Sequence, residues 1–237
     1  MASWFSLDGI DSEEIGIHVL EQPAIVVPQR RVKTFEIPGA ENAYVFDGDW
    51  GYEDVEKEVH CTVDTDIDPT LVASYLTPSA REIVFGNEED FCYHGYCANA
   101  VEILRCLRGR DKREFTARFI CSPFKFLAYP DDDIELTESD TIEHPGTARC
   151  YPKLRIVGSG SVTVTLHAVD DFTLNMGDSL TTLIVDSAAM VVTNPSGTVD
   201  RSRRMNGDYP WLDPGDNLIS WTGNVTKIVV TPRFAWL

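Results

Sequence analysis

The chain has 237 residues, 43% hydrophobic and 24% charged, which is typical of a soluble globular protein with one large or two modest domains. Its apolar runs are short, and none approaches the roughly 18 residues that a membrane-spanning helix needs. With 20 basic and 38 acidic side chains, the formal net charge is -18, which argues against non-specific binding to nucleic acids or anionic membranes.

The N-terminal segment MASWFSLDGIDSEEIG is acidic and has neither the basic region nor the apolar stretch of a secretory signal, so we expect folding in the cytosol. Six cysteines are spread along the chain without a CxxC pair. This spacing argues against a zinc site and predicts reduced thiols that pack as small apolar side chains.

Alternating apolar and polar residues predict half-buried antiparallel strands. The clearest such segments are 55–63, 113–121 and 161–167. One helix is predicted over 68–76, with Asp68 as its N-cap and Pro69 at its first position. The charged stretch 108–113 predicts the tip of a long β-hairpin.

An acidic, proline-bearing stretch interrupts the strands and predicts a linker at 131–150, between an N-terminal domain (1–130) and a C-terminal domain (151–237). Short strands follow closely after residue 151, and we expect a β-turn between two of them at GSGSVTV (158–164). Such spacing is typical of a compact β-sandwich of jelly-roll type. The predicted fold class is therefore mainly β.

The sequence carries no clear signature of a nucleophile, a metal site or a phosphate site. GxSxG, HExxH, Walker and EF-hand patterns are absent, and the five histidines are scattered singly. Three consecutive aspartates (131–133) lack the alternating spacing that directs carboxylates toward one calcium ion. We therefore expect a protein that is not an enzyme and that has no cofactor and no metal.

The stretch MNGDYPWLDPGDN (205–217) combines turn residues with two large aromatic side chains. Pro214 and Gly215 fit the central positions of a type II turn, which favours a corner of the fold. The alternative is a carbohydrate site in which aromatic rings stack on a sugar. Its candidate residues are Tyr209, Trp211 and Trp221. Aromatic residues of a β-sandwich belong more often to its core.

Several stretches occur in a diagnostic order. An aromatic first strand, an IPG element and an acidic glycine turn precede an alternating strand in WFSLDGIDSEEIGIHVLEQPAIVVPQRRVKTFEIPGAENAYVFDGDWGYEDVEKEVHCTV. Then come SYLTPSAREIVFGNEEDFCYHGYCAN, FTARFICSPFKF, YPKLRIVGSGSVTVTL, LIVDS and MNGDYPWLDPGDNLISWTGNVTKIVVTPRFAW. This order resembles siphophage distal tail proteins over nearly the whole chain. The family often has arginine after IPG, where this chain has Ala40–Glu41, which puts a contact through a base at this position in doubt.

The resemblance implies a structural virion protein, a distal tail hub of a long non-contractile phage tail. It implies a ring-forming N-terminal domain with one short helix and a long β-hairpin, followed by a galectin-like sandwich. Six subunits would form a ring that joins the tail tube protein to the tail-associated hub or fibre protein. The sandwich would serve as a platform for receptor-binding proteins or, alternatively, as a carbohydrate-binding module for adhesion to the host surface.

The same resemblance implies a location at the distal end of the virion tail, after assembly in the host cytoplasm. DNA would pass through the lumen without specific binding, and the protein would not insert into membranes. An acidic lumen would repel the DNA phosphates.

The charge distribution offers a candidate contact between subunits of such a ring. Residues 36–68 hold eleven acids and one base, whereas 105–118 are rich in bases. Closed rings need two different faces that meet head to tail. The candidate acids are Asp47, Asp49, Glu53 and Asp54, and the candidate bases of the neighbouring subunit are Arg108, Arg110, Lys112 and Arg113. Solvated charges on a loop are an equally good interpretation.

Overall fold

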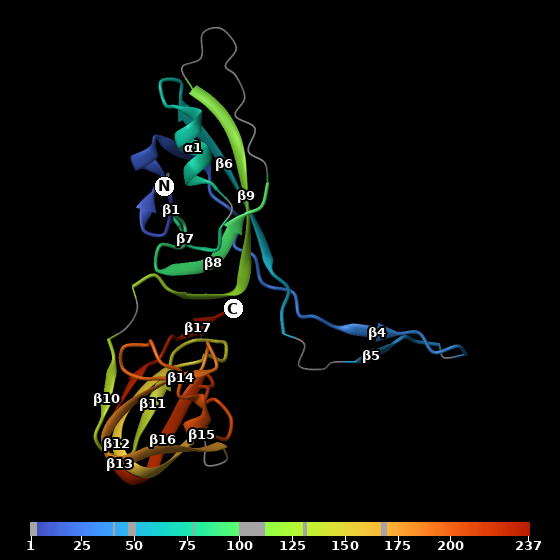
Figure 1. Cartoon of the computed structure of the whole chain (residues 1–237). Helices are drawn as coiled ribbons and strands as arrows, with labels where there is room; N and C mark the ends of the chain where they lie inside the picture. Colours follow the sequence, from blue (N-terminus) through green and yellow to red (C-terminus); the bar gives the residue numbers. More distant parts are fainter. Residues whose placement is uncertain are drawn as a thin grey trace. The chain divides into compact units, whose positions relative to one another are not determined.

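The computed structural model describes residues 4–39, 41–46, 51–77, 79–99, 112–129, 132–166 and 170–237 (Figure 1). The chain divides into two compact units, one of Met1–Ala128 with Leu237 and one of Tyr129–Trp236. Strands dominate both units, which confirms the predicted mainly β fold. In the described ranges, no helix is long and apolar enough to cross a membrane.

The first unit is built on an antiparallel sheet in the order β2-β1-β7-β8-β9-β6-β3. Its strands are β1 (Phe5–Leu7), β2 (Ile10–Asp11), β3 (Ile17–Glu21), β6 (Val55–Asp64), β7 (Arg81–Phe85), β8 (Phe91–Cys97) and β9 (Lys112–Leu127). Strands β6 and β9 contain the predicted segments 55–63 and 113–121. Most of the predicted hairpin tip at 108–113 lies outside the described residues, so only its last two residues can be placed, at the start of β9.

Helix α1 (Pro69–Tyr75) begins where the sequence predicts. The Asp68 carboxylate accepts a hydrogen bond of 2.9 Å from the amide of Thr70, and this N-cap satisfies one of the amides that a helix leaves free at its start. Val72 and Tyr75 are buried against the sheet. The structure adds two short 3-10 helices that were not predicted, η1 (Ser12–Ile15) and η2 (Ser202–Arg204).

Aromatic rings fill the centre of the first unit. The ring of Phe119 in β9 is fully buried, and its centroid lies 5.4 Å from that of Phe5 and 5.8 Å from that of Phe85. Both pairs meet edge to face, the arrangement that aromatic quadrupoles favour. This cluster holds β1, β7 and β9 together from the inside of the sheet.

Strands β4 (Lys33–Phe35) and β5 (Tyr44–Phe46) lie outside the main sheet. They pair with each other as a separate two-stranded sheet, in which Thr34 faces Val45 and Phe35 faces Tyr44. Figure 1 shows them at the end of a long excursion of the chain between β3 and β6. We call residues 25–54 the arm.

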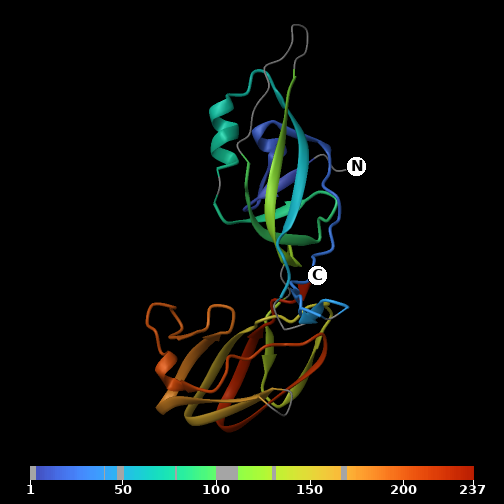
Figure 2. The ribbon, with the colours of Figure 1, turned by 90° about the vertical axis from the view of Figure 1, so that its right-hand side faces the viewer.

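The second unit is an antiparallel sheet with the main order β10-β16-β12-β13-β14, while β11 also pairs with β16 and β15 with β13. The strands of this sheet are β10 (Ile134–Leu136), β11 (Asp140–His144), β12 (Lys153–Leu166), β13 (Asp170–Asp186), β14 (Val191–Thr193), β15 (Met205–Asn206) and β16 (Gly215–Thr231). The short strand β17 (Ala235–Trp236) follows them in the chain and is not part of this sheet. Figure 2 shows the long strands, yellow to red, curling around the interior of this unit. The interior is lined by fully buried apolar residues such as Leu154, Val164 and Ile228.

Two expectations for this half of the chain are wrong. The stretch 158–164 is no turn, because β12 continues through it and only its pairing register shifts, near Gly158 and Gly160. In β16, Gly223 has φ +98°, and a Cβ there would lie 2.5 Å from the Ser161 carbonyl oxygen, so the strands approach too closely for a side chain.

The expected linker 131–150 is wrong as well, because its described part carries β10 and β11, which pair with β16.

Candidate functional site: an exposed apolar arm

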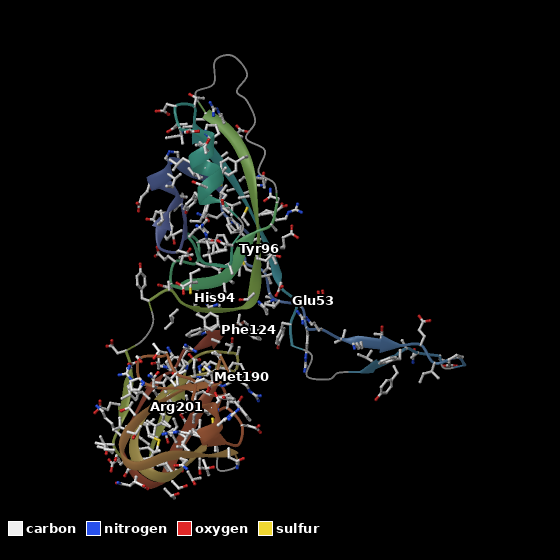
Figure 3. All side chains as sticks on the ribbon, in the orientation of Figure 1. Glu53, His94, Tyr96, Phe124, Met190 and Arg201 are labelled. Carbon is white, nitrogen blue, oxygen red and sulfur yellow. The ribbon has the colours of Figure 1, made fainter. Side chains whose placement is uncertain are left out.

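The arm presents apolar side chains to solvent. Every described residue between Gln29 and Val45 is exposed, so neither face of the β4–β5 ribbon is covered by the rest of the chain. Eight large apolar side chains of the arm are exposed: Ile25, Val26, Val27, Val32, Phe35, Ile37, Tyr44 and Val45. Figure 3 shows side chains projecting from the β4–β5 ribbon. A contiguous exposed apolar patch commonly marks an interaction surface.

The base of the arm is ordered by backbone contacts. The amide of Arg31 donates to the Gly51 carbonyl at 3.0 Å, and the amide of Glu53 donates to the Gln29 carbonyl at 2.8 Å. Tyr52 packs edge-on against Phe124 of β9, with the ring centroids 5.9 Å apart. The two halves of the arm therefore leave the sheet as a paired ladder. A two-stranded ribbon by itself is at best marginally stable in water, which also favours a partner for its tip.

The structure places only some of the charged residues proposed for a subunit contact. Asp47, Asp49, Arg108 and Arg110 lie outside the described residues. Glu53 and Asp54 are exposed at the base of the arm, where Figure 3 labels Glu53.

The two described bases of that proposed contact are engaged within their own subunit. Lys112 Nζ lies 3.6 Å from Asp64 Oδ1, and the Arg113 guanidinium donates to the Thr65 carbonyl at 3.0 Å. Exposed ion pairs such as the first contribute little to stability.

The stretch 205–217 is organised around a buried amide that the sequence analysis missed. Asn217 is fully buried, and its Oδ1 accepts from the amide of Asp213 at 2.9 Å. Its Nδ2 donates to the carbonyls of Gly215 at 2.7 Å, Asp213 at 2.8 Å and Ile142 at 3.3 Å. Gly215 has φ +94°, as the second central residue of a type II turn requires. This stretch therefore shapes a corner that leads into β16.

The three aromatic candidates for sugar binding are half-buried. The indole N–H of Trp211 donates to Asp213 Oδ2 at 3.2 Å, and the Arg149 guanidinium lies 4.7 Å from the centre of its ring. Arg149 Nε also donates to Asp213 Oδ1 at 2.9 Å. Trp221 lies in β16 opposite Val164, and Tyr209 precedes the corner. One face of Trp211 is thus occupied by an arginine of the same unit, which favours a packing role.

Replacing Trp211 by alanine is expected to destabilise the second unit by about 1–2 kcal/mol, because the cation–π contact and the bond to Asp213 are both lost. Urea denaturation of the whole chain measures this change. The same substitution at Tyr151, which is 44% exposed, should shift stability by less than about 0.5 kcal/mol. On a glycan array, we expect the wild type and Trp211→Ala to be indistinguishable. Glycan binding that is lost in this variant while the fold persists would instead support the carbohydrate site.

His144, one of the scattered histidines, is held inside the second unit. It is buried, Gly146 donates its amide to Nδ1 at 2.9 Å, and Nε2 lies 2.8 Å from the Ala148 carbonyl. Burial lowers the pKa of His144 below its usual value, and the ring stacks on Phe234. Both ring nitrogens are engaged, so this histidine holds the loop 144–148 and has no free base to offer.

The described cysteines Cys61, Cys92, Cys97, Cys121 and Cys150 are buried and form no disulfide with one another. Burial raises the pKa of the Cys150 thiol to about 12, which makes it a poor nucleophile at neutral pH. In the described part of the chain, no group of three or more histidine, cysteine or acidic side chains is arranged to hold a metal ion.

No family model and no curated protein matches this sequence. The chain is similar in structure to the crystal structure of the Dit protein of phage SPP1, described as a paradigm of the hub adsorption apparatus in phages that infect Gram-positive bacteria. The TM-score is 0.77 and the identity 19%, over 99% of each chain. A chain of the phage p2 baseplate in its activated conformation with Sr gives a TM-score of 0.49 and 8% identity, over 96% of this chain and 97% of the other. The chain therefore has the fold of the SPP1 Dit protein from end to end, and the resemblance seen in the sequence is confirmed at the level of the fold.

Proposed function

We propose that this chain is a structural, non-enzymatic virion protein: the distal tail hub of a long non-contractile phage tail, which forms a hexameric ring. The observation that carries the proposal is the arm, an exposed apolar ribbon on a fold shared with a phage hub protein. Ring formation supplies what this ribbon lacks, namely an apolar surface on a second copy. In the virion, the ring would join the tail tube to the tail-associated hub or fibre protein.

Energetics support a contact between copies through the arm. Burying one valine, isoleucine or phenylalanine side chain contributes about 1.5–3 kcal/mol. Phe35, Ile37, Tyr44 and Val45 lie on or next to the two strands and are each more than half exposed. An arm that reaches one neighbour, while the subunit receives the arm of the other, is a head-to-tail contact, and such contacts close into rings. The charge pairing of Glu53 and Asp54 with Lys112 and Arg113 of the neighbour remains a prediction within this contact.

The second unit fits the role of a platform for receptor-binding proteins. We place the assembled ring at the distal end of the tail, after assembly in the host cytoplasm, with DNA passing through its lumen. The net charge of -18 supports passage without adhesion, because like charges repel the phosphates.

Light scattering on the purified protein tests the ring. We expect a mass of six times the 26.5 kDa of one chain, and negative-stain images of a ring. The double variant Phe35→Ser/Tyr44→Ser removes a cross-strand apolar pair of the arm and is expected to shift the mass toward the monomer. At a concentration where the wild type is also monomeric, its unfolding midpoint should match that of the wild type, because both side chains are exposed in the single subunit.

A matched control replaces two exposed apolar residues of the second unit, Leu180→Ser/Met190→Ser, and should leave the ring intact. A wild-type protein that stays monomeric at every concentration contradicts the proposed function. A ring that survives the arm variant but fails in the control would move the contact to the second unit.

A further inference from the structure

A lysine is buried at the base of the arm. Lys57 is the third residue of β6, the strand that the chain enters after the arm. Its side chain lies on the face of β6 that points into the core, between those of Val55 and Val59. Its side chain is fully buried, and its Nζ lies 2.7 Å from Glu88 Oε2. Glu88 belongs to the turn between β7 and β8, and its side chain is only 6% exposed. Burying a charge is costly unless the charge is paired and hydrogen-bonded, so the neighbours of this pair decide whether it can remain ionised.

Glu88 is the centre of a fully partnered network. Its Oε1 accepts from Lys125 Nζ at 3.0 Å, and the hydroxyl of Tyr93 donates to Oε2 at 2.9 Å. Lys57 Nζ also lies 4.6 Å from the ring centre of Tyr93, within the range of a cation–π contact. Burial would raise the pKa of Glu88, but hydrogen bonds from the two lysines outweigh it and hold the pKa below its usual value. The carboxylate is therefore charged at neutral pH.

Side chains of this network and its neighbours also form hydrogen bonds with the backbone just before the arm. Lys57 Nζ donates to the Ala24 carbonyl at 3.4 Å. Asn87, the neighbour of Glu88, donates its Nδ2 to the Pro23 carbonyl at 2.8 Å. Gln22 donates its Nε2 to the Trp4 carbonyl at 3.0 Å. The Gln22 bond is separate from the Glu88 network, but with the bonds to Pro23 and Ala24 it holds three consecutive residues against the first unit immediately before the arm begins.

Stability alone does not account for a buried pair of this kind. Desolvation of two charges cancels much of their attraction, and apolar replacement of a whole buried pair is often neutral or stabilising. The pair instead fixes the direction in which the arm leaves the sheet. A charged hydrogen bond restricts the position of its acceptor more narrowly than apolar packing does. Here one acceptor is the carbonyl of Ala24, the residue before the arm, and the donor Lys57 lies in β6, the strand that follows the arm.

We propose that Lys57, Glu88 and Asn87 form a root clamp that fixes the direction in which the arm leaves the sheet, and so act as positioning residues for the contact between ring subunits. This inference rests on the proposed function for its biological role, whereas the clamp itself is a property of one subunit. An arm held in one direction loses less conformational freedom on docking, which favours association.

Hydrogen exchange with mass spectrometry on the full chain tests the clamp without requiring a ring. Lys57→Met keeps the length and apolar stem of the side chain, and Glu88 keeps its bonds to Lys125 and Tyr93. We expect the amides of Arg31 and Glu53 to exchange roughly tenfold faster or more, as the paired base of the arm opens more often. Exchange in β12 and β13 should stay unchanged.

Two further variants make the result decisive. Lys227→Met breaks an exposed ion pair with Glu135 in the second unit and should leave exchange in the arm as in the wild type. Asn87 is exposed, and Asn87→Ala removes its hydrogen bond to the Pro23 carbonyl, so this variant is expected to fold. It tests the clamp if Lys57→Met fails to fold. Unchanged exchange at the base of the arm in folded Lys57→Met, or in Asn87→Ala when Lys57→Met does not fold, overturns the clamp.

The ring provides a second, separate measurement. Lys57→Met retains every exposed apolar side chain of the arm, yet we expect it to need roughly tenfold more protein than the wild type to form rings. A wild type without rings contradicts the proposed function but leaves the exchange result to decide the clamp. Faster exchange with an unchanged concentration dependence of the ring would overturn the positioning role.

Discussion

Replacing Phe119 by alanine is expected to lower the free energy of unfolding of the first unit by about 3–5 kcal/mol. The ring is fully buried between Phe5 and Phe85, and its removal leaves a cavity that neighbouring rigid strands cannot fill. Two edge-to-face contacts are lost in addition to the buried area. A loss of this size is a large fraction of the stability of a typical domain.

Urea denaturation, with hydrogen exchange in β6 and β9 as a local probe, measures the effect of Phe119→Ala. The matched control is Phe35→Ala in the arm, where the same ring is 53% exposed. With both proteins monomeric, we expect the control to stay within about 0.5 kcal/mol of the wild type in stability, while at higher concentration it weakens the ring. The two substitutions thus separate folding from assembly. Equal losses of stability in both would contradict this description of core and arm.

The second large effect is expected at Asn217. Asn217→Ala removes the acceptor for the Asp213 amide and the donor to three carbonyls, all in a site closed to water. Leaving a buried polar group without a partner costs about 1–3 kcal/mol, so we expect a loss of about 2–4 kcal/mol in the second unit. The corner at 213–217 should also exchange its amides faster.

Asn224→Ala is the control for this prediction. Asn224 lies in the same strand β16 but is exposed, and its side chain donates one bond, to Ser159 Oγ. Its replacement should cost less than about 1 kcal/mol. Thermal unfolding followed by circular dichroism distinguishes the two variants. If Asn217→Ala unfolds at the wild-type midpoint, the amide does not hold the corner, and packing of Leu212 would have to explain it.

Local patterns predicted much of the first unit. Alternation in 55–63 identified β6, and Asp68 with Pro69 marked the start of α1 to the residue. The same alternation places Lys57 on the core face, where its charge argues against burial, and its partner Glu88 is 31 residues away in the sequence. A pairing over that distance depends on the turn between β7 and β8, and local periodicity carries no information about it.

The second unit shows why turn residues can mislead. Gly158 was taken as a sign of chain reversal, yet it allows close approach of neighbouring backbones within long strands, as Gly223 does in β16. A glycine in a strand permits a bulge as well as a turn, and the choice depends on the strands alongside. The same applies to the predicted linker 131–150: its composition is acidic, but its described part contains β10 and β11, which pair with β16.

The candidate site was only partly visible in the sequence. The apolar residues of 25–45 read equally well as a buried strand, and nothing local reveals that the ribbon lies off the main sheet. The sequence suggested Trp211 as a sugar contact because it is a large aromatic residue in a polar stretch. Its partner Arg149 is distant in the sequence, so the contact between them was not predicted. Composition identifies candidates for a site, but exposure is decided by the strand order, which the whole chain determines.

The pairing of β10 with the end of β16 has a consequence for the origin of variants. Ile134 faces Val230, so the first strand of the second unit pairs with its last long strand. A unit that has its own core and whose terminal strands are neighbours can be exchanged as a cassette. Recombination would therefore replace the second unit without changing a residue of the arm or of the first unit.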